Sequence, residues 1–362
     1  MEIGVPKEIK DREFRVGLTP SSVAVLNQNH HVVFVETGAG IGAGFSNRDY
    51  ERAGAKIVTD AASAWNKELV VKVKEPLKSE YQYIQSGQLL FTYLHLAADR
   101  ALTEALVKSG VSAIAYETVE LSDGRLPLLT PMSIIAGRLA VQFGARYLEK
   151  QQGGKGVLLG GIPGVRPGSV TILGGGIVGT EAAKIAVGMG AQVQIIDINV
   201  ERLAYLETLF GSRVQLLYSN PSHIEETVVN ADLLIGAVLV VGKKAPVLVN
   251  RDLVKKMGGG SVIVDVAVDQ GGCIETVRPT SHTNPVYVEE EVLHFGVPNM
   301  PGAVPRTSTQ ALNNSTLPYV LKLANFGLAA LERDTALGKG LNIKNHQILH
   351  PAVKEVFPDL VK

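Results

Sequence analysis

Three glycines with a G-x-G-x-x-G spacing, Gly174, Gly176 and Gly179, follow the apolar run 169–173 and precede a helix-like segment. In such a loop the first glycine permits a sharp strand-to-helix turn, the second lets the backbone approach a pyrophosphate, and the third allows close helix–strand packing. The helix then directs its unpaired N–H groups at the phosphates. The spacing therefore predicts a dinucleotide site, with Val178 as a further contact; a glycine turn that binds nothing is the alternative.

An acidic residue, Asp197, ends the next apolar run at 193–196, roughly 20 residues beyond the glycine turn. At this place a carboxylate accepts hydrogen bonds from both ribose hydroxyls and repels a 2′-phosphate. The sequence therefore favours NAD over NADP as the cofactor. Arg202, one helical turn further on, would soften this preference, and a solvated helix arginine is its alternative interpretation.

Four charged or titratable side chains stand near the ends of predicted strands, where open parallel sheets bind their ligands. They are Lys74 after the run 69–73, His95 at the end of an apolar run, Arg15 in the loop after the first strand, and Asp269 before a glycine turn. Period-two alternation places Tyr93 on the same face as His95. The alternatives are a solvated lysine, a hydrogen-bonded core histidine, a surface arginine and a turn-capping aspartate.

Short apolar runs alternate with helical segments along both halves of the chain. In the first half they are 2–5, 32–36, 69–73, 88–94 and 111–116; in the second they are 169–173, 192–196, 214–218, 233–236 and 261–266. This alternation is typical of parallel sheets covered by helices. We predict an α/β fold of two doubly wound parallel-sheet, Rossmann-like domains.

The proline turn at Thr130-Pro131 marks the first change of domain, and Ser133 is suited to cap a helix at 134–148. The proline-dense segment 297–305 suits neither a helix nor a central strand and marks a second crossing. The apolar helix at 308–331 then returns to the first domain. We therefore expect a substrate domain of residues 1–130 and 305–362, and an inserted nucleotide domain of residues 131–304. A cleft between the two is expected to close on substrate.

Composition excludes several classes of protein. Lys and Arg number 35 against 35 Asp and Glu, which argues against nucleic acid or an anionic membrane as a partner. We expect the single cysteine, Cys273, to be a small buried residue. No Cys/His cluster has the spacing of zinc ligands, so we expect no metal. The chain starts on a strand pattern rather than a signal peptide, and its longest apolar stretch, near 233–241, is too short for a bilayer. A cytoplasmic location follows.

Two blocks of sequence resemble the alanine dehydrogenase and nicotinamide nucleotide transhydrogenase family. Residues 4–9 and 15–20 are similar to its N-terminal signature, and the stretch from 154 to 176 is similar to its second signature. Within the family, the segments 73–76 and 93–97 resemble the alanine dehydrogenase branch. The similarity covers nearly the whole chain.

The resemblance implies oxidative deamination of L-alanine with NAD to pyruvate, ammonium and NADH, and the reverse reductive amination. Arg15 and Lys74 would bind the substrate carboxylate, since the guanidinium offers a bidentate fork and the lysine a second cation. Two proton-handling groups are required. We assign His95 as the principal acid/base and Asp269 as the partner that activates water or orients the amine.

Further cofactor contacts, and a homohexamer, are implied by the resemblance alone. Each of these residues has an ordinary alternative as a cap or packing residue. They are Ser133, Ser219, Val238, Leu239, Val266, Asp269, Arg278, Val297, Asn299 and Met300.

Three other functions remain compatible with this sequence. They are the soluble NAD-binding subunit of a transhydrogenase, a saccharopine-type amino-acid dehydrogenase, and a non-enzymatic NAD-binding regulator. The His95 motif argues against the first, and the four apt side chains at strand ends argue against the last.

Overall fold

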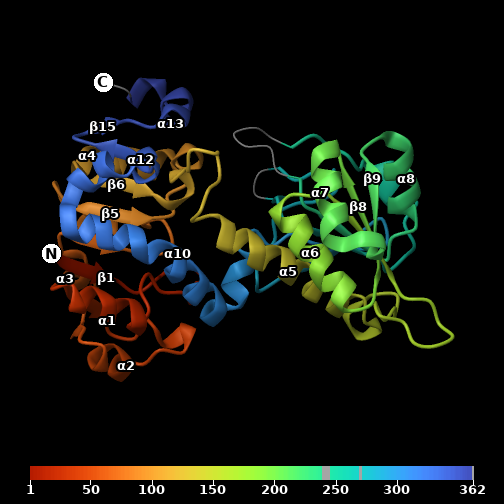
Figure 1. Cartoon of the computed structure of the whole chain (residues 1–362), viewed down its shortest axis with the longest axis horizontal. Helices are drawn as coiled ribbons and strands as arrows, with labels where there is room; N and C mark the ends of the chain where they lie inside the picture. Colours follow the sequence, from red (N-terminus) through yellow and green to blue (C-terminus); the bar gives the residue numbers. More distant parts are fainter. Residues whose placement is uncertain (239–244, 269–270, 361–362) are drawn as a thin grey trace. The chain divides into compact units, whose positions relative to one another are not determined.

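The computed structural model describes residues 1–238, 245–268 and 271–360. The chain divides into two compact units (Figure 1): unit 1 comprises Met1–Met132 and Val304–Lys362, and unit 2 comprises Ser133–Ala303. Both changes of unit fall within two residues of the boundaries expected from the sequence, 130/131 and 304/305. Unit 2 is continuous in sequence and interrupts unit 1.

Unit 1 is built on an eight-stranded sheet in the order β15-β14-β6-β5-β4-β1-β2-β3. The strands from β6 to β3 pair in parallel, whereas β14 and β15 extend the sheet antiparallel. The strand order reverses between β1 and β4, which makes this the topological switch point of the sheet. The strands are β1 (Glu2–Val5), β2 (Val32–Glu36), β3 (Lys56–Val58), β4 (Leu69–Val71), β5 (Leu89–Thr92), β6 (Ser112–Ala115), β14 (Leu341–Lys344) and β15 (Gln347–Ile348).

Helices surround this sheet, and side-chain caps define where several of them begin (Figure 1). In the first helix, Thr19 accepts a hydrogen bond from the Ser22 amide and Pro20 occupies the first turn, the two features that favour a helix start. The helices of unit 1 are α1 (Pro20–Gln28), α2 (Asn47–Arg52), α3 (Ala61–Trp65), α4 (Arg100–Ser109), α10 (Pro305–Phe326), α11 (Ala330–Arg333), α12 (Thr335–Lys339) and α13 (Pro351–Val356).

Unit 2 has a seven-stranded sheet in the order β12-β13-β11-β10-β7-β8-β9, whose six parallel strands, β13 to β9, repeat the order of the parallel strands of unit 1. All pairs are parallel except β12 with β13, and the switch point lies between β7 and β10. The strands are β7 (Ser169–Leu173), β8 (Gln192–Asp197), β9 (Val214–Tyr218), β10 (Leu233–Gly236), β11 (Val262–Asp265), β12 (Val286–Glu289) and β13 (Val292–Phe295).

The helices of unit 2 follow its strands in the usual βα alternation. They are α6 (Ile177–Gly188), α7 (Val200–Phe210), α8 (Pro221–Val229) and α9 (Arg251–Val254), while α5 (Thr130–Tyr147) begins at the end of unit 1 and runs into unit 2. Asn199, Asn220 and Asn250 each cap the helix that follows them. The predicted loop or hairpin at 153–168 contains an antiparallel bridge between Ile162 and Val165.

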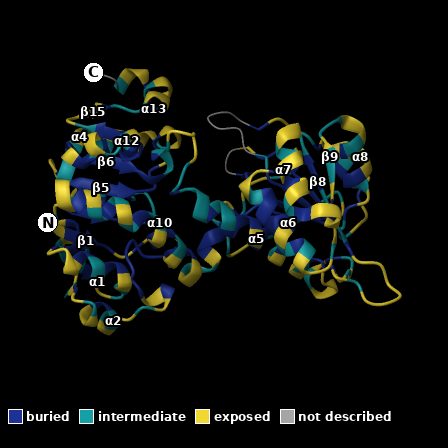
Figure 2. Ribbon diagram, in the orientation of Figure 1, coloured by how far each residue is buried: buried dark blue, intermediate teal, exposed yellow. Residues whose placement is uncertain are grey.

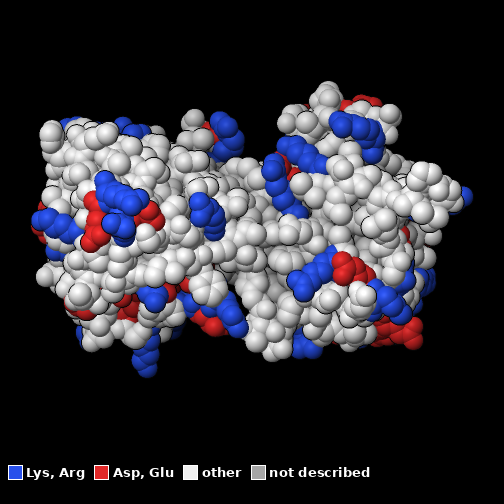
Figure 3. Space-filling model, turned by 90° about the horizontal axis from the view of Figure 1, so that it is seen from below, with Lys and Arg blue, Asp and Glu red and all other residues white. Residues whose placement is uncertain are grey.

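The strands form the buried core of each unit, and the outer helix surfaces are exposed (Figure 2). On the face drawn in Figure 3, acidic and basic side chains are interspersed and separated by uncharged surface, as the balanced composition leads one to expect. Cys273 is buried, as predicted. Among the described residues, no helix combines the length and the apolar character needed to cross a membrane.

The sheets differ from the prediction at their edges. The sequence analysis missed five strands at or near the sheet edges, β3, β12, β13, β14 and β15. Since β12, β14 and β15 pair antiparallel, the sheets that were predicted to be parallel are mixed. Strand ends also shift. β4 stops at Val71 and β5 at Thr92, so Lys74, Tyr93 and His95 lie beyond their strands.

Two predicted helix starts were wrong. The helix α5 begins at Thr130, so Ser133 lies inside it rather than capping it; proline is well tolerated in a first helical turn, and Pro131 fits there. The helix predicted at 308–331 begins at Pro305, because proline is tolerated in the first turn, and it ends at Phe326. The second crossing contains a short 3₁₀ helix, Met300–Ala303, which the proline content had argued against.

Candidate active site

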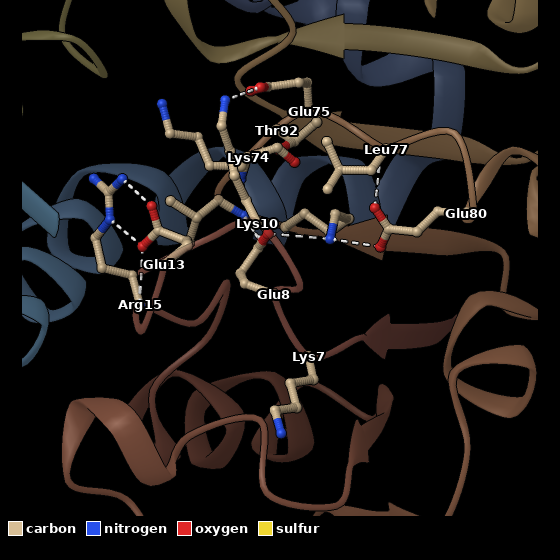
Figure 4. Close-up of polar contacts among 12 residues, drawn as sticks. Lys7, Glu8, Lys10, Glu13, Arg15, Lys74, Glu75, Leu77, Glu80 and Thr92 are labelled. Carbon is tan, nitrogen blue, oxygen red and sulfur yellow. Dashed lines mark hydrogen bonds and ion pairs between the residues drawn. The ribbon is translucent and has the colours of Figure 1, made fainter. Parts of the chain in front are cut away.

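The loops after β1 and β4 meet at the switch point of the unit 1 sheet. β1 pairs with β4 in parallel, so both loops leave the same edge of the sheet, where doubly wound folds bind ligands. The first loop carries Arg15 and the second carries Lys74. Figure 4 shows the charged side chains of both loops interleaved.

Arg15 is buried, with only 2% of its side chain exposed, so the surface-arginine alternative is wrong. Its Nε donates to Glu13 Oε1 at 2.7 Å and its Nη2 donates to Glu13 Oε2 at 2.6 Å. The bidentate edge predicted for the substrate thus already holds Glu13 (Figure 4). A substrate carboxylate cannot use that edge while Glu13 occupies it. Burial alone would lower the pKa of Arg15, but the Glu13 carboxylate raises it above the usual value.

Lys74 is half-buried, and its Nζ makes no hydrogen bond or ion pair with any residue in the described part of the chain. Its backbone is held on both sides: the N–H donates to Glu8 Oε1 at 3.3 Å, and the carbonyl accepts from Thr92 Oγ1 at 3.0 Å. Burial lowers the pKa of Lys74, Arg15 lowers it further, and Glu75 acts in the opposite direction. An amine of this kind, with no described partner, is suited to bind an anionic group of a ligand.

A second ion pair lies next to Lys74. The Lys10 ammonium pairs with Glu75 Oε1, while Glu75 Oε2 is buried without a hydrogen-bond partner among the described residues. Burial raises the pKa of Glu75, but the hydrogen bond from Lys10 and the charge of Lys74 lower it below its usual value. Glu75 therefore stays a carboxylate and adds negative charge beside the Lys74 amine.

Lys72 forms a buried cluster with Glu8 and Glu80 that the sequence analysis missed. Its Nζ lies 3.1 Å from Glu8 Oε2 and 2.9 Å from Glu80 Oε1. The available signal was a lysine inside a run that is apolar on both faces, because such a lysine needs carboxylate partners.

His95 has a left-handed backbone, with φ of 50°, and 48% of its side chain is exposed. The core-histidine alternative is therefore wrong. The Glu117 carboxylate accepts from the His95 N–H at 2.6 Å and from the Leu94 N–H at 3.1 Å, and its Oε1 lies 3.9 Å from His95 Nδ1. The Tyr93 ring stacks parallel to the imidazole, with centroids 6.0 Å apart. Glu117, which the sequence analysis did not select, thus fixes a strained residue that faces solvent.

The glycine loop of unit 2 has the predicted form. A Cβ on Gly179 would lie against the Gly174 carbonyl oxygen closer than any real Cβ contact, so only glycine lets α6 pack onto the turn. Gly176 caps α6 without a side-chain hydrogen bond, is exposed, and has no neighbouring atom within 4 Å of where a Cβ would stand. Backbone N–H groups at this end of α6 are therefore open to an approaching anion.

Asp197 and Arg202 both contact this loop. Asp197 Oδ2 accepts from the Gly175 N–H at 2.6 Å, and Oδ1 accepts from the Asn199 N–H at 2.8 Å. Arg202 Nε donates to the Gly175 carbonyl at 2.6 Å, and its Nη2 donates to Thr180 Oγ1 at 2.7 Å. Arg202 is therefore a loop-fixing residue and not the solvated arginine of the alternative interpretation.

Three more predicted contacts lie at the same edge of the unit 2 sheet. Ser219 donates its N–H to the Asp197 carbonyl at 3.0 Å, and Val266 donates its N–H to the Gly236 carbonyl at 2.9 Å. The Val238 nitrogen would lie 3.2 Å from a Cβ on Gly174. Five of the predicted residues, Gly174, Asp197, Ser219, Val238 and Val266, therefore share the carboxyl ends of β7 to β11.

The remaining predicted contacts are scattered or not described. Arg278 is exposed and lies over the Tyr287 ring, the Asn299 carbonyl lies 2.8 Å from His282 Nε2, and Val297 and Met300 are buried. Ser133 lies in α5. Asp269 and Leu239 lie outside the described residues.

The residues of the loop fit a dinucleotide. The open surface at Gly176 leaves space for a pyrophosphate, and the N-terminus of α6 supplies donors for it. A carboxylate offers about four acceptor positions, of which the two amides facing Asp197 use two, so capacity remains for two ribose hydroxyls.

A glycine loop followed by an acidic residue, at the carboxyl edge of a sheet with this strand order, gives unit 2 a Rossmann-like fold. The chain as a whole belongs to the alanine dehydrogenase/PNT family. Residues 4–136 match the family's N-terminal domain and residues 140–351 match its C-terminal domain.

Full-length relatives agree with this assignment. The chain is 58% identical to the alanine dehydrogenase of Bacillus subtilis (strain 168), over 98% of this chain and 94% of that protein. It is 56% identical to the alanine dehydrogenase of Methanococcus maripaludis, over 98% and 95% of the two chains.

Solved structures show the same fold. A structure of an L-alanine dehydrogenase superposes with a TM-score of 0.98, at 71% identity, over 100% of both chains. A transhydrogenase from Sinorhizobium meliloti gives a TM-score of 0.83 at 23% identity, over 97% of this chain and 100% of that one, which shows a shared fold and no more.

Proposed function

We infer that this chain catalyses the NAD-dependent oxidative deamination of L-alanine to pyruvate, ammonium and NADH, and the reverse reaction. The observation that carries this conclusion is the 54–58% identity to curated alanine dehydrogenases along almost the entire chain. The charged side chains of unit 1 and the glycine loop of unit 2 supply the chemistry that such a reaction requires.

We propose that Lys74, with Arg15, binds the substrate carboxylate. The Lys74 amine lies beside the Arg15 guanidinium and has no partner among the described residues, which supports this role. Because the Nε and Nη2 edge of Arg15 is held by Glu13, its contribution is mainly a fixed positive charge, and Lys74 makes the closer contact. In the reverse direction Lys74 also stabilises the negative charge that develops on the pyruvate oxygen.

We propose that His95 is the principal acid/base. NAD, when held by the glycine loop and Asp197, would supply the acceptor for the hydride of the alanine Cα. His95 takes a proton from the substrate ammonium beforehand and releases it to solvent, so that the nitrogen lone pair is available as the iminium forms. It then takes a proton from the water that attacks this iminium and returns it to the nitrogen, which leaves as ammonia while the carbonyl of pyruvate forms. Its exposure and the fixed backbone that Glu117 gives it support this role. Asp269 is proposed as the partner that orients that water.

We propose that unit 2 binds NAD through the Gly174–Gly179 loop and Asp197, and that Arg202 fixes the loop rather than contacting a 2′-phosphate. A preference for NAD over NADP follows, because the Asp197 carboxylate repels a phosphate at that position. The further contacts proposed are Ser133, Ser219, Val238, Leu239, Val266, Arg278, Val297, Asn299 and Met300.

We also propose a cytoplasmic homo-oligomer, as the family resemblance implies a hexamer. Exposed apolar side chains in the 153–168 segment of unit 2, namely Leu158, Ile162 and Val165, support self-association. Light scattering on the purified chain measures the oligomeric mass directly.

A panel of amino acids with NAD and with NADP, followed by the absorbance of the reduced cofactor, tests the reaction class, cofactor and substrate together. We expect L-alanine with NAD to give the highest kcat/KM. Turnover of a larger amino acid in preference would favour a saccharopine-type enzyme. A chain that binds NAD but oxidises no amino acid would contradict the proposal and favour a transhydrogenase subunit or a regulator.

A further inference from the structure

The cluster of Lys72, Glu8 and Glu80, hereafter the Lys72 cluster, is an ion triad with almost no access to solvent. The exposed fractions of the side chains are 1% for Lys72, 2% for Glu8 and 5% for Glu80. One ammonium is shared between two carboxylates, and the Trp65 ring lies 5.6 Å from the Lys72 nitrogen. Figure 4 shows the Glu8 carboxylate at the centre, between the Lys74 segment and Glu80.

Such a cluster contributes little to stability by itself. Desolvation of buried ions offsets most of their attraction, and apolar residues of similar volume are often at least as stabilising. Burial would lower the pKa of Lys72, but Glu8 and Glu80 raise it, so the ammonium persists. The role of the cluster must therefore be sought in the groups that it orients.

The groups that it orients are the backbone amides of the segment after β4. Glu8 Oε1 accepts from the Val73 N–H at 2.6 Å and from the Lys74 N–H at 3.3 Å, and Glu80 Oε2 accepts from the Leu77 N–H at 2.8 Å. These amides lie beyond the end of β4, and buried N–H groups require acceptors. Lys72 holds both acceptors in place.

We propose that Glu8 is a positioning residue for the amino-acid reaction, which acts by fixing the backbone of Lys74 so that its amine meets the substrate carboxylate. This inference rests on the proposed function of Lys74. Lysine has a long, flexible stem, so its backbone must be held if the amine is to occupy one place. Glu8 holds the N–H of Lys74, and Thr92 holds its carbonyl.

Glu80 provides a matched control within the same cluster. Like Glu8 it is a buried carboxylate that pairs with Lys72. Glu80 accepts one backbone amide, that of Leu77, three residues beyond Lys74, whereas Glu8 accepts the amides of Val73 and Lys74. Loss of either carboxylate should therefore lower the melting temperature, whereas only the loss of Glu8 releases Lys74.

The test compares Glu8→Met, Glu80→Met, Lys74→Met and the double variant Glu8→Met/Lys74→Met, since methionine has a similar length and no oxygen acceptor. The measurements are the KM for L-alanine, kcat, the Kd for NADH and the melting temperature. We expect Glu8→Met to raise the KM for L-alanine at least about tenfold more than Glu80→Met does, since small displacements of a positioning group cost such factors. The Kd for NADH should not change, and the double variant should behave like Lys74→Met alone.

Equal increases of KM in Glu8→Met and Glu80→Met, or additive effects in the double variant, would show a merely structural role and overturn the inference. A normal KM in Lys74→Met would instead contradict the proposed function of Lys74. If Glu8→Met does not fold, Thr92→Val removes the other backbone contact of Lys74 with a side chain of the same shape. An unchanged KM in Thr92→Val would then overturn the inference.

Discussion

Charge pairing governs the residues around the unit 1 switch point. Four cations, Lys10, Arg15, Lys72 and Lys74, lie among four carboxylates, Glu8, Glu13, Glu75 and Glu80. Lys10, Arg15 and Lys72 each form an ion pair with a carboxylate, whereas the Lys74 amine has no such partner among the residues described. This difference singles out Lys74 as the cation with the capacity to receive an incoming carboxylate.

The lowered pKa of Lys74 predicts how pyruvate binding depends on pH. Burial and Arg15 hold that pKa below the usual lysine value of 10.5. The protonated amine attracts a carboxylate, so affinity is present at low pH and lost as the pH rises through the lowered pKa. We expect pyruvate to bind the NADH complex more weakly in alkaline solution, with a midpoint below 10.5. Titration of pyruvate in the absence of ammonium measures this.

The control for this prediction is Lys74→Arg, because a guanidinium keeps its charge throughout this range of pH. The alkaline loss should disappear in Lys74→Arg. Pyruvate affinity that stays constant to pH 10.5 in the parent, or an identical midpoint in the variant, would contradict the role of Lys74.

Substitution of His95 tests the acid/base assignment. We expect His95→Ala to lower kcat by ~10²–10⁴, the usual contribution of a positioned acid or base, with an unchanged Kd for NADH. His30→Ala is the matched control, since His30 is also exposed and left-handed, with φ of 64°. A kcat for His95→Ala within a few-fold of that of His30→Ala would rule out histidine catalysis.

At the scale of elements, the candidate site residues lie in the loops after parallel strands, and the strands themselves form the buried core. The strands β7, β9 and β10 have the bounds predicted from the sequence, because apolar runs between helical segments are a strong local signal. The short strands β14 and β15 escaped prediction, because an alternation of apolar and polar residues over only two to four positions is too short to stand out.

The candidate site was predictable only in part, because a single sequence shows local patterns but not contacts between distant residues. Arg15, Lys74 and His95 were selected because they stand near strand ends. Glu8 and Glu117 were missed, because they lie 66 residues from Lys74 and 22 residues from His95, and such pairings leave no mark in one sequence. Glu13 was missed although it lies two residues from Arg15, because that spacing alone does not show that the two side chains pair.

Substitution of Gly176, in the turn before α6, tests whether this element binds a pyrophosphate. Nothing lies within 4 Å of a Cβ on Gly176, whose φ of −64° suits any residue, so Gly176→Ala should fold normally. Its methyl group would nevertheless stand where a pyrophosphate approaches. We expect a Kd for NADH raised about tenfold or more, with little change in the melting temperature.

Gly188→Ala is the control, because Gly188 also has open space around a Cβ but lies at the other end of α6. It should bind NADH like the parent and be as stable or slightly more so. Unchanged NADH affinity in Gly176→Ala would contradict the assignment of this loop to the pyrophosphate.

At the scale of the whole molecule, the parallel strands of the two units have the same order. The side chains at the two switch points differ. Unit 1 gathers buried cations and carboxylates there, and unit 2 presents a glycine loop and an acid. The proposed division of labour assigns the amino acid to unit 1 and the nucleotide to unit 2. Substitutions at Lys74 or His95 should accordingly leave NADH binding intact.

Transfer of deuterium from L-alanine labelled at Cα tests the central claim most directly. If the chain moves a hydride from Cα of alanine to NAD, the NADH formed carries the deuterium, as mass spectrometry of the isolated cofactor would show, and the pyruvate does not. Formation of unlabelled NADH, or of none while NAD still binds, would contradict the account.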